Sequence, residues 1–410
     1  MKHRLRSARG VWFFLIALLG QTTNGAAGTQ ETATHWVGTW ASSPQRADVD
    51  SRAPALGFAD RTLRQVVRVS VGGSKIRVRF SNAFGTADLT IVSAHVAKPG
   101  KNGSIHPDTD RALAFETRPT IAIPPGALVY SDPVDFDLPP LSDLAVTIRL
   151  KGVPDGLTTH SGSRATSYLA KGDAVAATDL SSVETIDHWY FLNGVDVLSG
   201  DSAAAVVVLG DSITDGRGST TNENHRWTDE FARRLGAHGR TARVAVLNEG
   251  IGGNRLLQDG LGPSALARLD RDVLAQTSAR WLIVLEGVND IGTCTKECNL
   301  DKTTAAIIGA YEQIIVRAHL QGMRAYGATI LPFGGSFYAS PAAERARQTV
   351  NSWIRTSGRF DAVIDFDAVT RDSRNPANLS SEVDSGDHVH PSDRGYRAMG
   401  EAIDLQLFEE

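Results

Sequence analysis

Residues 206–214, with the sequence Val-Val-Val-Leu-Gly-Asp-Ser-Ile-Thr, decide the fold of the second half of this chain. A continuous apolar run of this kind is typical of a buried parallel strand. The run ends at Gly210, and Ser212 follows where a loop must lead into a helix. The sequence therefore places a hydroxyl group at the carboxyl end of a strand, the edge where open α/β sheets bind their ligands. Alone, this signal is weak, because serine also caps many helices.

After Gly200 the sequence alternates between apolar strand patterns and helical patterns. The predicted strands cover residues 204–209, 243–247, 281–285, 324–331 and 362–366. Among the helical patterns between them, Trp227, Phe231 and Leu235 recur at the spacing of one helix face. This alternation predicts a five-stranded parallel sheet covered by helices.

Residues 35–198 follow the two-residue period of β-strands instead. Val67, Val69 and Val71 alternate with polar residues, and Gly72-Gly73 then predicts the turn of a hairpin. Further strands are expected at residues 89–96, 127–130 and 144–150, separated by breaks rich in proline and glycine. Several short strands with regular turns predict a β-sandwich of the jelly-roll kind.

The length of 410 residues favours two domains, because one hydrophobic core rarely grows so large. Residues 1–27 have the basic, apolar and small-residue order of a secretory signal peptide, with a retained membrane anchor as the alternative. We therefore predict a signal peptide at 1–27, a sandwich at 28–199 and an α/β domain at 200–410, in a protein secreted to the extracellular space or the periplasm.

Cleavage after residue 27 would remove four lysine and arginine residues and no acidic ones, and would lower the formal net charge from −4 to −8. An acidic secreted protein has no evident affinity for nucleic acid or anionic membranes, and no later apolar stretch is long enough to span a bilayer. The oligomeric state cannot be read from the sequence.

The two cysteines, Cys294 and Cys298, are separated by only three residues. In an exported chain such a pair predicts a local disulfide that fixes a loop, with free thiols as the alternative. A metal site would need further ligands, and no cluster of cysteine and histidine lies nearby in the sequence.

Three further polar blocks follow later strands, and together with the first they suit acyl transfer. This chemistry needs an activated nucleophile, a base and N–H donors for the oxyanion. Ser212 is the predicted nucleophile, His390 the base, and Asp387 the carboxylate that orients the ring from three residues away. The backbone N–H groups of Ser212 and Gly253 and the side-chain amide of Asn289 are the predicted oxyanion donors.

Some of these assignments have competitors in the sequence. Gly252 competes with Gly253 for the donor role, and Asp384 and Asp393 are alternatives to Asp387. His388 is expected to be a loop residue outside the catalytic set.

With these four blocks, the chain resembles the SGNH/GDSL hydrolases. The matching segments are Gly210-Asp-Ser212, Gly252-Gly-Asn254, Gly287-Val-Asn-Asp290 and Asp387-His-Val-His390. The resemblance covers about residues 203–405 and implies a flavodoxin-like three-layer α/β/α domain, the site residues named above, and no metal or cofactor. It departs from the usual third block at Val288, where glycine or threonine is common.

Longer strings narrow the resemblance further. Residues 210–219 and 285–292, with the leader at 36–44, resemble secreted two-domain aryl- and acyl-esterases first noted in xylan-degradation gene clusters. This resemblance implies a small-molecule or polysaccharide ester as substrate. The preferred hypothesis is that the protein removes acetyl or other short acyl groups from carbohydrate. The alternatives are an arylesterase or lysophospholipase, acyl transfer to a sugar, and a carbohydrate-binding protein with an inactive α/β domain.

Overall fold

The computed structural model describes residues 34–48, 51, 54, 57–153, 155–294 and 298–409. The predicted signal peptide at 1–27 lies outside the described residues.

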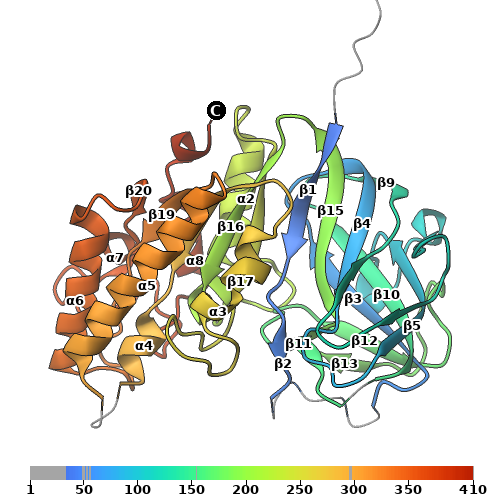
Figure 1. Ribbon diagram of the computed structural model, residues 1–410, viewed down its shortest axis with the longest axis horizontal. Coiled ribbons are helices and arrows are strands. Elements are labelled where there is room, and N and C mark those ends of the chain that lie inside the picture. The colour runs from blue at the N-terminus through green and yellow to red at the C-terminus, as the bar shows by residue number, and fades with distance from the viewer. Residues whose placement is uncertain are drawn as a thin grey trace, which may run out of the picture. The chain divides into compact units, whose positions relative to one another are not determined.

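The first part of the described chain is rich in strands (Figure 1). Its strands are β1 (Thr34–Ala41), β2 (Gln45–Arg46), β3 (Arg61–Arg68), β4 (Gly73–Ser81), β5 (Leu89–Ala97), β6 (Arg111–Ala112), β7 (Ile121–Ile123), β8 (Leu128–Tyr130), β9 (Val134–Leu138), β10 (Asp143–Gly152), β11 (Thr158–His160), β12 (Ser167–Lys171), β13 (Glu184–Ile186), β14 (Trp189–Tyr190) and β15 (Leu192–Gly200). One antiparallel sheet has the order β1-β15-β4-β8, with β9 also beside β4, and a second has the order β13-β12-β3-β10-β5-β6, with β7 also beside β5. Strands β14, β11 and β2 form a small third sheet. The side chains of the two larger sheets belong to one hydrophobic core, and this arrangement confirms the predicted β-sandwich.

The predicted hairpin around Gly72-Gly73 is wrong. Strand β3 pairs with β10 and β12, whereas β4 pairs with β15, β8 and β9, so the two strands belong to different sheets. Neither glycine has the positive φ that a two-residue hairpin turn requires. A Cβ atom on Gly72 would lie 2.4 Å from the carbonyl oxygen of Leu138, and one on Gly73 would lie 2.5 Å from that of Leu198. The glycines therefore serve close backbone approach where the chain crosses between sheets.

The second part contains the predicted parallel sheet. Its strands are β16 (Ala204–Gly210), β17 (Val244–Gly250), β18 (Ala279–Leu285), β19 (Arg324–Ala328) and β20 (Ala362–Ile364), and their order β17-β16-β18-β19-β20 is that of flavodoxin-like folds. Every residue of β16 is buried, as a central strand covered on both faces requires. Five strands and their parallel pairing are confirmed.

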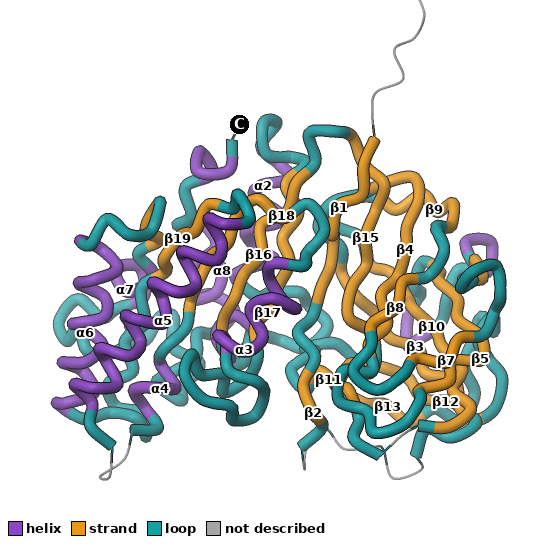
Figure 2. The backbone as a smooth tube through the Cα atoms, viewed as in Figure 1, coloured by secondary structure: helices purple, strands orange, loops and turns teal. Residues whose placement is uncertain are grey.

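Helices gather around this sheet, whereas the region up to β15 consists almost entirely of strands and loops (Figure 2). They are α1 (Ser212–Asp215), α2 (Trp227–Ala237), α3 (Ala265–Leu269), α4 (Val288–Gly292), α5 (Leu300–Leu320), α6 (Pro341–Thr356), α7 (Phe366–Thr370) and α8 (Asp393–Glu401). Helices α2, α7 and α8 pack together, and α3 to α6 form a second group. Figure 1 shows α5 in front of the sheet and α8 behind it, which gives three layers. Within the described residues, no helix is long and apolar enough to cross a membrane.

The strand-rich part and the α/β part share a continuous core. Strand β1 packs against β17, and the N–H group of Gly38 donates to the carbonyl of Thr277 at 3.1 Å. Trp40 and Trp189 are buried and meet edge to face, with ring centroids 4.9 Å apart, which agrees with a core role for these aromatics. From Thr34 onward the chain clusters as one unit, and the domain boundary at residues 199/200 stays a prediction.

Candidate active site

Ser212 lies at the first position of α1, directly after the carboxyl end of β16. Asp211 caps the helix, since its carboxylate accepts a hydrogen bond of 2.9 Å from the N–H group of Ile213. Burial raises the pKa of Asp211 to about 7, although the hydrogen bond from Ile213 opposes this shift. The short helix then stops at Gly216, so the serine sits on a tight strand-to-helix turn.

The structure brings Ser212, His390 and Asp387 together. Ser212 Oγ lies 2.8 Å from Nε2 of His390, and Nδ1 of the same ring lies 2.6 Å from a carboxylate oxygen of Asp387. The backbone N–H groups of Val389 and His390 donate to the other oxygen of Asp387 at 3.0 and 2.8 Å. The carboxylate is thus held by its own loop, and it fixes the tautomer in which Nε2 is free to accept the serine proton.

The electrostatics of the pair suit a neutral histidine that acts as a base. Burial lowers the pKa of the His390 ring, while the hydrogen bond to Asp387 opposes the shift, and the charges of Arg217 and Arg164 lower the pKa further. Burial alone would raise the pKa of Asp387. The hydrogen bonds from the N–H group and the ring of His390 outweigh it and lower this pKa to about 2, so the carboxylate stays ionised.

The predicted oxyanion donors lie around the same serine. Gly253 has a φ of +69°, a conformation that glycine adopts without strain. In the described part of the chain, the N–H groups of Gly252 and Gly253 donate to no backbone carbonyl, so both remain available. Asn289 follows Gly287, whose φ of +107° allows the sharp turn from β18 into α4.

The amide of Asn289 is fixed at both ends. Its nitrogen donates to the carbonyl of Asn254 at 2.8 Å, and its oxygen accepts a hydrogen bond of 2.9 Å from the hydroxyl of Tyr338. An amide nitrogen carries two protons, and one of them is left for a ligand. Asp290 holds the neighbouring loop, because its carboxylate accepts from the N–H groups of Leu256 and Leu257 at 2.9 and 3.1 Å.

These groups face a cavity of about 360 Å³. Both parts of the chain line it. The strand-rich part contributes Gln45, Asp48, Ser161, Gly162, Arg164 and His188, and the α/β part contributes Ser212, Asp215, Arg217, Gly252, Gly253, Leu261, Asn289, Phe337, Tyr338, Asp387, Val389 and His390. Nothing in the sequence pattern predicted the residues from the strand-rich part, because they lie far from the four blocks along the chain.

A larger cavity of about 530 Å³ lies between the two parts of the chain, and Asp215 lines both cavities.

A second histidine and carboxylate pair joins the two parts beside the site. Nε2 of His160 lies 3.0 Å from Asp215 at the end of α1, and Nδ1 lies 3.0 Å from the carbonyl oxygen of Ser43. All three residues are buried. Two further histidines have hydrogen-bond partners of their own: Nδ1 of His188 lies 2.7 Å from the carbonyl oxygen of Ser161, and Nδ1 of His225 lies 2.9 Å from Asp393.

Sequence reasoning also missed Arg268, whose fully buried guanidinium ties the blocks together. It donates to the carbonyl of Gly210 at 3.0 Å, to the side-chain oxygen of Asn254 at 2.8 and 3.0 Å, and to Ser43 Oγ at 2.7 Å. It also lies 3.5 Å from Glu286 at the end of β18. One side chain thus links the ends of two strands, the glycine-rich loop and the strand-rich part.

The competitors of Asp387 are engaged elsewhere. Asp384 lies 2.5 Å from Nδ1 of His388, and Asp393 accepts hydrogen bonds from the N–H and hydroxyl groups of Thr220 at 2.9 and 2.6 Å. Neither carboxylate lies beside His390.

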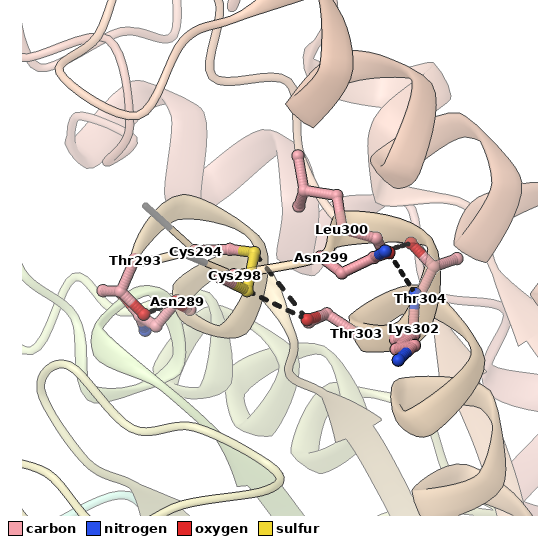
Figure 3. The surroundings of a disulfide bond; sticks show 9 residues. All are labelled: Asn289, Thr293, Cys294, Cys298, Asn299, Leu300, Lys302, Thr303 and Thr304. Carbon is pink, nitrogen blue, oxygen red and sulfur yellow. Dashed lines mark hydrogen bonds between the residues drawn. A yellow bond between two sulfur atoms is a disulfide. The ribbon is translucent and has the colours of Figure 1, made fainter. Parts of the chain in front are cut away.

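The predicted disulfide between Cys294 and Cys298 is present (Figure 3). It closes the loop after α4, where the hydroxyl of Thr293 donates to the carbonyl of Asn289 at 2.6 Å. Thr303 Oγ1 lies 3.3 Å from the sulfur of Cys298 and connects the loop to α5. The disulfide therefore braces the segment directly beyond the predicted oxyanion donor. Among the described residues, no group of three or more histidine, cysteine, aspartate or glutamate side chains is placed to hold a metal ion.

Residues 208–398 match the model of the GDSL-like Lipase/Acylhydrolase family. No curated protein matches the chain. Among solved structures, a GDSL-like lipase from Bacteroides thetaiotaomicron is 20% identical with a TM-score of 0.37, over 50% of this chain and 87% of that one. An acetylxylan esterase from Geobacillus stearothermophilus is 21% identical with a TM-score of 0.38, over 50% of this chain and 94% of that one. The family match spans every strand end that carries a predicted site residue, and over residues 208–398, just under half of the chain, the protein is similar to the GDSL-like lipases and acylhydrolases.

Proposed function

We propose that Ser212 is the nucleophile, His390 the general base and Asp387 the orienting carboxylate of a two-step ester hydrolysis. The observation that carries the proposal is the distance of 2.8 Å between Ser212 Oγ and His390 Nε2, on a ring whose Nδ1 lies 2.6 Å from Asp387. Ser212 Oγ attacks the ester carbonyl carbon and passes its proton to Nε2. The protonated ring then gives this proton to the leaving alcohol, and the acyl group stays on the serine.

In the second step, His390 takes a proton from water, which attacks the acyl carbon and releases the acid with return of the serine hydroxyl. Negative charge develops on the former carbonyl oxygen in both steps. The N–H groups of Ser212 and Gly253 and the free amide proton of Asn289 are the proposed donors to this oxygen. No cofactor takes part in these steps.

The proposed substrate is an acetyl or other short acyl ester of a carbohydrate, acted on outside the cytoplasm. The strand-rich part contributes the polar side chains of Gln45, Ser161 and His188 to the cavity lining, which supports a hydrophilic alcohol moiety. The preference for a short acyl group rests on the sequence resemblance. The xylan-linked subfamily and secretion rest on the sequence resemblance and on the pattern of residues 1–27.

Aryl or lipid esters are the second candidate. Leu261 and Phe337 line the cavity with 54% and 78% of their surface exposed, which is unusual for large apolar side chains and suits a hydrophobic ester. Acyl transfer to an added alcohol would use the same residues. The opposing hypothesis is a carbohydrate-binding protein with an inactive α/β domain.

The test is hydrolysis of p-nitrophenyl esters from acetate to octanoate by the full-length chain and by Ser212→Ala. Activity that is highest on acetate and falls at least about 10³-fold in the variant is expected. A maximum at octanoate would favour the lipid candidate. No hydrolysis of any ester would refute the proposal and favour the binding protein.

A further inference from the structure

Two arginines line the cavity of the candidate site, and among the described residues neither has a carboxylate partner. Arg164 comes from the loop after β11, and Arg217 follows α1 by two residues, so one guanidinium is supplied by each part of the chain. In the described residues, neither side chain takes part in a salt bridge, whereas most buried and half-buried arginines of this chain do. We propose that Arg164 and Arg217 bind an anionic group, so that the preferred ester carries a carboxylate, sulfate or phosphate on its alcohol moiety. This inference rests on the proposed function and names its substrate class.

The position of Arg164 is built into the loop. Its φ of +48° is unfavourable for residues other than glycine, so contacts with the surrounding chain must stabilise this backbone conformation. The carbonyl of Arg164 accepts a hydrogen bond of 2.9 Å from the N–H group of Asn222, and Arg226 donates to the carbonyls of Ser163 and Asp215 on either side of the junction. The half-buried side chain keeps Nε out of solvent, and this nitrogen has no hydrogen-bond acceptor within the described chain. A buried cationic donor without a partner is costly, and an anionic ligand would satisfy it.

Arg217 is also anchored through its backbone, which leaves its exposed side chain free to meet a ligand. Its N–H group donates to the carbonyl of Ser212 at 2.9 Å, and its own carbonyl accepts a hydrogen bond of 2.6 Å from the hydroxyl of Tyr396. The first of these hydrogen bonds ties Arg217 to the turn that carries Ser212. Burial is the main cause that lowers the pKa of the His390 ring, and both guanidinium charges lower it further.

Three carboxylates line the same cavity, and each already accepts hydrogen bonds from groups other than these arginines. Asp387 accepts from His390 and Val389, and Asp215 lies 3.0 Å from His160. Asp48 accepts from the N–H group and the hydroxyl of Ser51, both at 2.8 Å. The acidic groups of the site therefore form no ion pair with the two arginines, which can bind an external anion.

The test uses aryl acetates that differ only in the charge of the leaving group: phenyl acetate, 4-acetoxybenzoate, 4-acetoxybenzenesulfonate and the cationic 4-acetoxyphenyl-trimethylammonium. Full-length wild type is compared with Arg164→Gln, Arg217→Gln and, should the first fold poorly, Arg164→Lys, with circular dichroism as the check of folding. Arg397→Gln is the matched control, because it removes the same charge from α8 at a different cavity. The readout is the ratio of kcat/KM for the anionic ester to that for the neutral ester, in which differences of leaving group cancel between wild type and variant.

We expect each glutamine variant to lower this ratio about tenfold and the control to leave it unchanged. The wild-type preference for the anionic ester should weaken at higher salt, because salt screens the charges. A comparison of acetylated polyuronate with acetylated glucomannan extends the test to polymers, and the sulfonate arm distinguishes a carboxylate site from a sulfate site. If the ratio is unchanged in both variants while Ser212-dependent hydrolysis of phenyl acetate persists, the anion site is refuted and the esterase proposal stands. If no ester is hydrolysed, the proposed function itself fails.

Discussion

Replacing Arg268 by methionine should cause the largest loss of stability of any single change near the site. Methionine has a similar length and no donors, so the backbone keeps its shape while the acceptors of the guanidinium lose their partner. The acceptors left behind include the carbonyls of Gly210 and Glu249 and the side chain of Asn254, all of them buried. Removing one partner of a buried charged network typically costs about 3–5 kcal/mol, so we expect the free energy of unfolding to fall by about 4 kcal/mol.

The loss should also depend on pH. Burial and, to a smaller extent, the charge of Asp272 raise the pKa of Glu249 to about 8, although the charge of Arg268 opposes the shift. The pKa of Glu286 is also raised well above its usual value, again mainly by burial. Carboxyl groups with a raised pKa in the folded state contribute stability at low pH that is lost as the pH rises towards the folded-state pKa. Without Arg268 these groups resist ionisation more strongly, so the variant should lose more stability at pH 8 than at pH 5.

Urea unfolding followed by tryptophan fluorescence measures the effect at both pH values, beside hydrolysis of p-nitrophenyl acetate. Arg317→Met is the matched control, because Arg317 makes a solvent-exposed ion pair with Asp270 near the same segment and should cost less than about 1 kcal/mol. A loss below 1 kcal/mol for Arg268→Met, or the same loss at pH 5 and pH 8, would refute the reasoning.

Three further outcomes follow from the site. Burial lowers the pKa of the His390 ring, so kcat/KM should rise with pH with an apparent pKa below 6.5 and stay flat above it; an apparent pKa above 6.5 would contradict a neutral base. Replacing Cys294 and Cys298 together by serine opens a loop of only a few residues and should lower the free energy of unfolding by about 2 kcal/mol, which thermal unfolding with and without reductant can measure. Gly162→Ala would place a Cβ atom 1.8 Å from an oxygen of Asp215, so we expect about 1–3 kcal/mol of destabilisation in urea unfolding together with reduced hydrolysis; unchanged values would show that the carboxylate can move.

The sequence predicted those features that are encoded locally. The strand β16 and its successors could be recognised because a buried parallel strand is a continuous apolar run that ends at a polar or glycine residue. The close placement of Asp387 and His390 followed from a spacing of three residues, which a single loop can close. The disulfide between Cys294 and Cys298 was predictable for the same reason, since only a short segment separates the two residues.

What the sequence could not predict depends on contacts between distant segments. Arg268 lies in a short helical stretch where an arginine is usually exposed, and only the folded chain shows that it is buried among acceptors from several blocks. Gly72-Gly73 suits a hairpin turn and a close strand crossing equally well, and the choice between them is made by the neighbours of β4 in the other sheet. Arg164 is the clearest case, because the role that we propose for it depends on a loop of the strand-rich part that reaches the cavity beside Ser212. The proposed nucleophile and base can therefore be predicted from four short motifs, whereas the groups that we propose select the substrate come from the packing of one part of the chain against the other. Exchanging loop residues near 161–164 should accordingly change which esters are hydrolysed more than it changes the chemistry at Ser212.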